Sequence, residues 1–102
     1  MTGCVFHPEA ARDLDEIWDF IAEDSPGGAD RVIADILGRI EALVPFPNQG
    51  LRRPDLTSRP LRFVAVHQYL IAYAADERPL WVIAVMHGRR SPLMAAILRG
   101  RG

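Results

Sequence analysis

The stretch that decides the fold is LRFVAVHQYLIAYAA, residues 61–75. It contains two apolar runs, Leu61–Val66 and Tyr69–Ala75, separated only by His67 and Gln68. Both runs are rich in β-branched and aromatic residues, which favour strands. A two-residue interruption has the length of a tight hairpin turn, although this one lacks the preferred Asn-Gly pair. The stretch therefore predicts two antiparallel strands joined by a short turn.

That turn fixes which side chains face one another. A two-residue turn places Val66 opposite Tyr69, and counting back along both strands pairs Arg62 with Tyr73. We therefore expect a guanidinium group beside a phenol on one face of the sheet.

The rest of the chain completes an α+β domain. Downstream, Asp76–Pro79 forms a turn before a third apolar run, Leu80–Met86, and Ser91-Pro92 precedes a short final helix, Leu93–Leu98. Upstream, Val5-Phe6 is a first short strand. We expect the order β-α-α-β-β-β in a single domain, residues 1–102, with a helical hairpin on one face of a small antiparallel sheet.

Two helices are expected between the first and second strands. The first begins with Pro8 at its first position, and its apolar residues recur at helical spacing at Leu14, Ile17, Trp18 and Ile21. Ser25–Gly28 ends it, a second helix begins near Ala29 with Asp30 close to its positive end, and Pro45–Gly50 ends that one. We expect both tryptophans, Trp18 and Trp81, to lie in the core.

Composition limits the classes of protein that the chain can belong to. A single cysteine, Cys4, cannot form an internal disulfide, and we expect it to be buried as a small hydrophobic residue. The N-terminus lacks the basic region and long apolar run of a signal peptide, and no apolar stretch has the length of a membrane span. We expect a cytoplasmic protein that does not cross a membrane.

Charge divides the sequence at its middle. Residues 1–50 carry ten acids against three arginines, a net charge of −7, whereas residues 51–102 carry nine arginines against three acids, a net charge of +6. All twelve basic residues are arginine, which binds carboxylates and phosphates in a bidentate manner. The pattern indicates an anionic target or an acidic partner, although a biased codon usage would also give arginine without lysine.

A cationic cluster follows the third apolar run at His87-Gly88-Arg89-Arg90. A histidine at a strand end and two neighbouring arginines could bind a phosphate or a carboxylate through charge-assisted bonds. Each residue also has a purely structural interpretation. His87 could be hydrogen-bonded within the fold, Tyr73 could be a half-buried strand residue, Arg62 could pair with a helix acid, and one of the two arginines could simply be solvated.

No cofactor or metal is expected. His7, His67, His87 and Cys4 do not match a known metal-ligand spacing. The sequence also lacks a glycine-rich phosphate loop, a cysteine pair and a nucleophile elbow.

Three motifs, taken in order, resemble one family, the RelE/ParE toxins of bacterial type II toxin–antitoxin modules. The first is Phe6–Leu14 with Ile17–Ala22, which resembles the first helix of these toxins. The second is Leu61-Arg62 with Val66 and Tyr69–Tyr73, which resembles their central strand pair. The third is Val85–Arg90, which resembles their closing V-x-H-G-x-R signature. One departure is Ser91, which stands where the family often has an acid.

This resemblance implies a growth-inhibiting toxin that a small antitoxin neutralises by wrapping its C-terminal segment over it. An acidic antitoxin tail that folds on binding would suit the arginine-rich half. We expect a hetero-oligomer in which the antitoxin contacts Trp18, Ile21, Arg59 and Arg62.

Three interpretations of the activity stay open. The first is a ParE-like toxin that poisons DNA gyrase without a catalytic set, and it is favoured by the absence of lysine and by the long first helix. Its target contacts would be Arg90, Arg89, His87, Arg62 and Tyr73. The second is a RelE-like, ribosome-dependent mRNA endoribonuclease, in which Tyr73 and His87 transfer protons and Arg62 and Arg90 stabilise the developing charge. The third is a non-toxic module that only binds an antitoxin.

Overall fold

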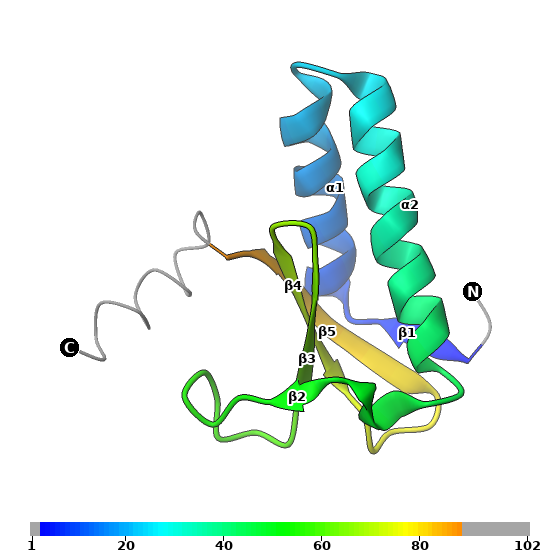
Figure 1. The fold of residues 1–102 in the computed structure, drawn as a ribbon, viewed down its shortest axis with the longest axis vertical. Coiled ribbons are helices and arrows are strands. Elements are labelled where there is room, and N and C mark those ends of the chain that lie inside the picture. Colours follow the sequence, from blue (N-terminus) through cyan, green and yellow to red (C-terminus); the bar gives the residue numbers. More distant parts are fainter. Residues whose placement is uncertain (1–2, 89–102) are drawn as a thin grey trace.

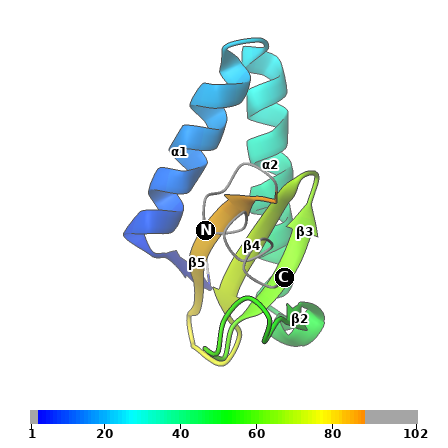
Figure 2. The ribbon, with the colours of Figure 1, turned by 90° about the vertical axis from the view of Figure 1, so that its left-hand side faces the viewer.

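The computed structural model describes residues 3–88, whose helices and strands form two layers (Figure 1). In chain order the elements are β1 (Cys4–Phe6), α1 (Pro8–Ala22), α2 (Pro26–Leu43), the 3₁₀ turn η1 (Pro47–Gln49), β2 (Leu51–Arg52), β3 (Arg62–Val66), β4 (Tyr69–Ala74) and β5 (Leu80–His87). Figure 2 shows β3, β4 and β5 in front of α2. The predicted α+β fold with a helical hairpin on one face of a sheet is confirmed. The predicted helix Leu93–Leu98 lies outside the described residues.

The sheet is mixed, with the strand order β1-β5-β4-β3-β2. All pairings are antiparallel except that of β1 with β5, in which Cys4 lies beside Leu80. This pairing differs from the predicted antiparallel sheet. Parallel neighbours need a long crossover, and here almost the whole domain lies between the two strands. The two-residue strand β2 was also not predicted from the sequence.

The central hairpin has the predicted register. Arg62 lies opposite Tyr73, and Val66 lies opposite Tyr69. In the turn between them, His67 has a φ of 55°, the left-handed region that usually favours glycine. The His67 ring also contacts α2, with Nε2 2.7 Å from Asp35 Oδ2. This contact ties the tip of the hairpin to the helical layer.

Both helices begin with a side-chain cap followed by proline. His7 Nδ1 accepts the N–H of Glu9 at the start of α1, which confirms Pro8 as a first-turn residue. Ser25 Oγ accepts the N–H of Gly28 at 3.0 Å, so α2 begins at Pro26 rather than near Ala29. The sequence indicates Ser25–Gly28 only as the end of the first helix, whereas in the structure Ser25 caps α2 and the next three residues form its first turn. Because α2 starts at Pro26, its first turn contains no acid. Asp30 lies beyond that turn, so the prediction that it lies close to the positive end of the helix was wrong.

Two apolar clusters lie on opposite faces of the sheet. The main core lies between the helices and the sheet, and its fully buried members include Ile36, Ile40, Ile71 and Val82. A smaller cluster around Phe63 lies on the other face of the sheet. The small cluster shows that these strands are apolar on both faces, as is typical of a sheet that is covered on both sides. Cys4 is buried as predicted, and burial raises the pKa of its thiol.

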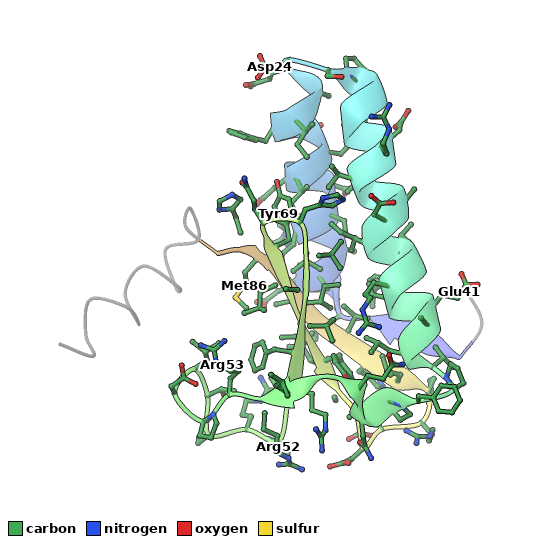
Figure 3. All side chains as sticks on the ribbon, in the orientation of Figure 1. Asp24, Glu41, Arg52, Arg53, Tyr69 and Met86 are labelled. Carbon is green, nitrogen blue, oxygen red and sulfur yellow. The ribbon has the colours of Figure 1, made fainter. Side chains whose placement is uncertain are left out.

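The charge division of the sequence is also a division in space. In Figure 3, Asp24 lies at the tip of the helical hairpin, whereas Arg52 and Arg53 lie at the opposite end, around β2. The described part of the molecule therefore has an acidic helical end and an arginine-rich end beneath the sheet.

Candidate functional site

The predicted pair of Arg62 and Tyr73 is present, but both side chains are used to hold the chain together. The Tyr73 hydroxyl donates to the carbonyl oxygen of Pro47 at 2.6 Å and accepts the N–H of Gly50 at 2.9 Å. Tyr73 is fully buried, and this burial is the main cause that raises the pKa of its phenol. A phenol that is enclosed and bonded to two backbone groups is not placed to exchange protons with a substrate.

Arg62 acts on the same segment. Its Nη1 donates to the carbonyl oxygen of Gly50 at 2.8 Å and to that of Asn48 at 3.5 Å. Within residues 3–88 it makes no ion pair with a helix acid, which is the pairing considered from the sequence. Arg62 and Tyr73 together fasten η1 and the start of β2 to the sheet.

Gly50 is necessary for this arrangement because of its close approach to the sheet. A Cβ at this position would lie 2.5 Å from the Tyr73 hydroxyl oxygen and 2.9 Å from the carbonyl oxygen of Phe63. The turn is held from the helical side as well, because Gln49 donates to the carbonyl oxygen of Ala42 at 2.8 Å. No single signal in the sequence pointed to this rigid junction.

His87 lies half-buried at the end of β5, as predicted. Its Nε2 lies 2.9 Å from Gln68 Oε1, and its ring meets the Tyr69 ring edge-on with centroids 5.2 Å apart. The neighbouring Gly88 N–H donates to the carbonyl oxygen of Gln68 at 2.9 Å. The end of β5 is therefore held against the β3–β4 turn. The predicted partners of His87 in the cationic cluster, Arg89 and Arg90, lie outside the described residues.

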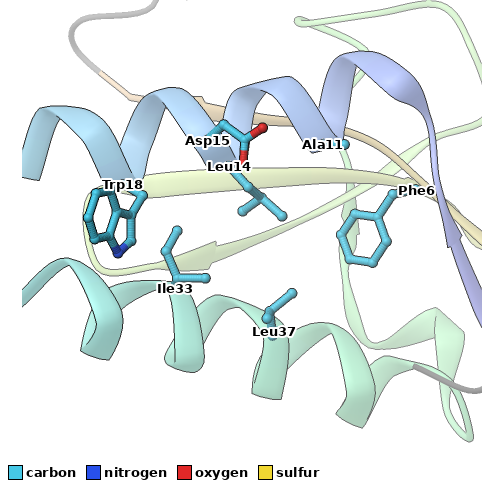
Figure 4. Close-up of a pocket in the computed structure, with 7 residues that line it drawn as sticks. All are labelled: Phe6, Ala11, Leu14, Asp15, Trp18, Ile33 and Leu37. Atoms are coloured by element: carbon cyan, nitrogen blue, oxygen red, sulfur yellow. The ribbon is translucent and has the colours of Figure 1, made fainter.

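Trp18 does not lie in the core, so this prediction was wrong. It is 37% exposed, and its Nε1 donates to Asp30 Oδ1 at 2.8 Å across the helical hairpin. Its helical spacing with Leu14 places it beside the apolar stripe, but the ring faces the space between the two helices (Figure 4). The other tryptophan, Trp81, is half-buried and belongs to neither apolar cluster, so its predicted place in the core was wrong as well. Ile21, the second predicted antitoxin contact on α1, is partly buried against the main core.

The interhelical groove beside Trp18, hereafter the hairpin groove, has a volume of about 440 Å³. Figure 4 shows its lining side chains between α1 and α2, with the strands behind them. The lining residues are Phe6, Ala11, Leu14, Asp15, Trp18, Ile33 and Leu37. All of these except Asp15 are apolar or aromatic, so the groove can accept apolar side chains of a partner.

A second cavity, of about 320 Å³, lies on the sheet face that the helices leave open. Its floor includes Phe63 and Met86, and Arg59 and Glu9 supply its charged groups. Within residues 3–88 the Arg59 guanidinium has no hydrogen-bond or ion-pair partner, unlike that of Arg62. Arg59 is therefore placed to meet an anionic group from outside.

Sequence reasoning missed the role of Asp13. Its Oδ2 accepts the N–H of Val85 at 2.9 Å, which joins α1 to the edge of β5 beyond its pairing with β1. Burial is the main cause that raises the pKa of this carboxyl, and Glu16 adds to it, while the Val85 hydrogen bond opposes the shift. A signal was present, because Asp13 follows the buried Ala10 by three residues and so shares its helix face.

Two negative findings apply to residues 3–88. They contain no group of three or more histidine, cysteine, aspartate or glutamate side chains that could hold a metal ion. No helix in this part of the chain has the length and apolar character needed to cross a membrane.

Comparison with known proteins identifies the family. Residues 4–92 match the model described as "ParE toxin of type II toxin-antitoxin system, parDE". The chain is 33% identical over 81 residues to "Putative toxin Y4kP" of Sinorhizobium fredii, which covers 79% of this chain and 82% of that protein. Its fold is similar to a structure described as "Chromosomal ParDE TA system from P. aeruginosa", with a TM-score of 0.67 and 22% identity, over 82% of this chain and 92% of that one. The chain therefore belongs to the ParE toxin family of type II toxin–antitoxin systems.

Proposed function

We propose that this protein inhibits growth by poisoning DNA gyrase in the cytoplasm and that a cognate antitoxin neutralises it. One observation favours this target over the ribosome. The ribonuclease interpretation assigns proton transfer to Tyr73 and His87, and the Tyr73 hydroxyl is buried and bonded to Pro47 and Gly50. RNA cleavage by a 2′-hydroxyl needs both an acid and a base, whereas binding to gyrase needs neither.

The target contacts follow from the same argument. Arg62 and Tyr73 hold η1 and β2, so they serve the fold first. We place the contact with gyrase at the end of β5, at His87 and at the two arginines that follow it in the sequence, Arg89 and Arg90. Their guanidinium groups suit carboxylates on a protein or phosphates of bound DNA.

The antitoxin would cover two separate surfaces. One is the helical hairpin, where Trp18 is exposed and Ile21 lies partly exposed. The other is the sheet cavity, where Arg59 could pair with an acidic tail. The complex would be a hetero-oligomer that hides the apolar surface of both.

The test is to assay purified toxin on gyrase and on translation side by side. We expect loss of supercoiling or trapped cleaved DNA, with intact mRNA. The double variant R89A/R90A should weaken gyrase inhibition by at least about tenfold. Arg31→Ala on the exposed surface of α2 removes one guanidinium elsewhere and should leave it unchanged. Codon-phased mRNA cuts that disappear in His87→Gln would instead support the ribonuclease.

A growth assay separates both activities from the third interpretation. Expression without antitoxin should arrest growth and induce DNA-damage signalling. Unchanged growth, with folded protein present in the cells, would identify a non-toxic antitoxin-binding module.

A further inference from the structure

Three arginines surround the turn η1 at the arginine-rich end of the molecule. Arg62 on β3 lies directly opposite Arg52 on the edge strand β2, and opposite residues of an antiparallel pair share a face of the sheet. Arg39 reaches the same turn from α2, where its Nη1 donates to Gln49 Oε1 at 3.2 Å. We call these three residues the η1 arginine cluster. Figure 2 shows β2 at the lower edge of the molecule, away from the tip of the helical hairpin.

Two of the three guanidinium groups are held in place by the turn. Arg62 is bound through Nη1 to the carbonyl oxygens of Asn48 and Gly50, and Arg39 is bound through Nη1 to Gln49. In the part of the chain that the structure describes, the Nε and Nη2 atoms of both arginines have no hydrogen-bond partner. A planar guanidinium that is fixed through one nitrogen keeps its other donors for a ligand and loses little side-chain entropy when it binds.

The cluster carries three positive charges that no acid neutralises. Within residues 3–88, none of its arginines lies within ion-pair distance of a carboxylate. Burial raises the pKa of Tyr73, and the charges of Arg62 and Arg39 both oppose the rise, so both act on the same buried oxygen. Like charges directly opposite each other on neighbouring strands, as Arg52 and Arg62 are, destabilise a sheet. A bound anion would remove this cost, so the arrangement indicates an anion-binding surface.

The rigidity and the position of the cluster favour the backbone of a nucleic-acid duplex over an acidic peptide. A duplex is a stiff rod with one negative charge per about 1.7 Å of axis, so it meets several fixed cations at once. A flexible acidic peptide must be ordered on the surface, at a cost in conformational entropy. The apolar cavity beside Arg59, which suits such a peptide, lies on the other face of the sheet. The acidic tip of the hairpin lies at the opposite end from Arg52 and so does not repel the duplex at close range (Figure 3).

We propose that the η1 arginine cluster binds the phosphodiester backbone of duplex DNA, with its guanidinium groups on phosphates and without contacts to the bases. This surface is separate from the end of β5, at His87, where we place the contact with gyrase. Binding through about three phosphates is weak and independent of sequence. It concentrates the protein on DNA, where the proposed target acts.

The test measures the fluorescence anisotropy of a labelled duplex of about 20 base pairs with the full chain, in the absence of gyrase. For three phosphate contacts, the slope of log K against log salt should be about −2.7 or steeper, an affinity loss of about fortyfold or more between about 50 and about 200 mM salt. Two duplexes of unrelated sequence should bind within about twofold of each other. The absence of binding at low salt overturns the proposal, and so does a polyglutamate peptide that binds as tightly as the duplex.

Matched substitutions locate the binding. Arg52 is exposed, and in the described structure its guanidinium has no hydrogen-bond partner, so Arg52→Ala should leave the melting temperature unchanged. It should make the salt slope shallower by about 0.9, whereas Arg52→Lys keeps the charge and should keep the slope. Arg31→Ala removes the same charge from the exposed surface of α2 and should change the slope by less than about 0.3. Equal changes in Arg52→Ala and Arg31→Ala would indicate attraction by overall charge and overturn the proposed cluster.

Two controls exclude other parts of the chain. The effect of Arg52→Ala should be the same in the R89A/R90A background, and an effect that disappears there would assign the binding to the arginines after β5 and overturn the proposal. Phe46 precedes η1 and is 69% exposed, and Phe46→Ala should change the affinity for the duplex by less than about twofold. A single strand that binds more tightly than the duplex and loses affinity in Phe46→Ala would indicate base stacking, which overturns binding through the backbone alone.

Gyrase inhibition is measured on the same preparation. Its absence would remove the proposed target without affecting the DNA-binding result, because the anisotropy assay contains no gyrase.

Discussion

The hydroxyl oxygen of Tyr73 lies 2.6 Å from the carbonyl oxygen of Pro47 and donates to it from a fully buried position on β4. The same oxygen accepts the Gly50 N–H, so removing it leaves two backbone groups without this partner. We expect Tyr73→Phe to lower the free energy of unfolding by about 1–3 kcal/mol. The melting temperature should fall by about 4–8 °C for each kcal/mol lost. Lost gyrase inhibition at an unchanged melting temperature would contradict this structural role.

Alkaline pH should reveal the burial of the Tyr73 phenol through a loss of stability. Burial raises the pKa of Tyr73 above its ordinary value of about 10, so the folded state holds the phenol proton more tightly than the unfolded state does. Its contribution is fully present below about pH 10 and is lost as pH rises through the folded pKa. Urea unfolding of the wild type between about pH 9 and pH 11 should therefore show a steeper loss than Tyr73→Phe. Cys4, whose pKa is also raised, is common to both proteins.

Two glycine-to-alanine substitutions should change the free energy of unfolding in opposite directions. Gly50→Ala places a Cβ against the Tyr73 hydroxyl and the Phe63 backbone, and should destabilise the fold by about 1–3 kcal/mol or more. Gly38→Ala lies within α2, where a Cβ meets nothing within 4 Å, and should stabilise it by about 0.5–1 kcal/mol. Thermal unfolding measures both. A tolerated Gly50→Ala would show that η1 can move away from the sheet.

Arg59 and Arg62 should separate binding from stability. Arg62→Ala removes the donor to the Gly50 carbonyl and should cost about 1–2 kcal/mol of stability. Arg59→Ala should leave the melting temperature within about 1 °C while weakening the antitoxin complex by about three- to tenfold, since its guanidinium is free within residues 3–88. Isothermal titration at two salt concentrations measures the affinity. An antitoxin affinity that does not change with Arg59→Ala would remove the sheet cavity as a contact.

The strand pairing could be predicted from the sequence because both runs and their turn are local. Once His67-Gln68 is taken as the turn, the pairing of Arg62 with Tyr73 follows by counting, and the structure has it. Periodicity likewise located both helices. The parallel pairing of Cys4 with Leu80 could not be predicted by counting. The two strands lie far apart in the sequence, and no local pattern of residues indicates that they pair.

The site was less predictable because the roles of its side chains depend on tertiary contacts. The spacing of Trp18 matched the apolar stripe, yet its ring faces the groove and bonds to Asp30. The pairing of Arg62 with Tyr73 suggested chemistry, whereas both side chains bind backbone groups of a turn that the sequence showed only as a break. In the sequence Ser25 indicates only the end of the first helix, but its side chain caps α2.

Asp13 allows the sharpest test of a contact that the sequence did not reveal. Asp13→Ala removes the acceptor of the Val85 N–H and should destabilise the fold by about 1–2 kcal/mol at neutral pH. Asp13→Asn keeps an oxygen that can accept this bond but cannot ionise. The two variants therefore separate the hydrogen bond from the charge.

The charge itself should oppose folding above acidic pH. Burial raises the pKa of the Asp13 carboxyl, so its contribution to stability is fully present below its ordinary value of about 3.8 and is lost as pH rises through the folded pKa. Asp13→Asn should remove this loss, and the difference in unfolding free energy between variant and wild type should grow in favour of the variant from about pH 3.5 upward. Urea unfolding across this range measures the difference. A difference that shrinks with rising pH would mean that the folded state stabilises the carboxylate, and that the Val85 hydrogen bond outweighs burial.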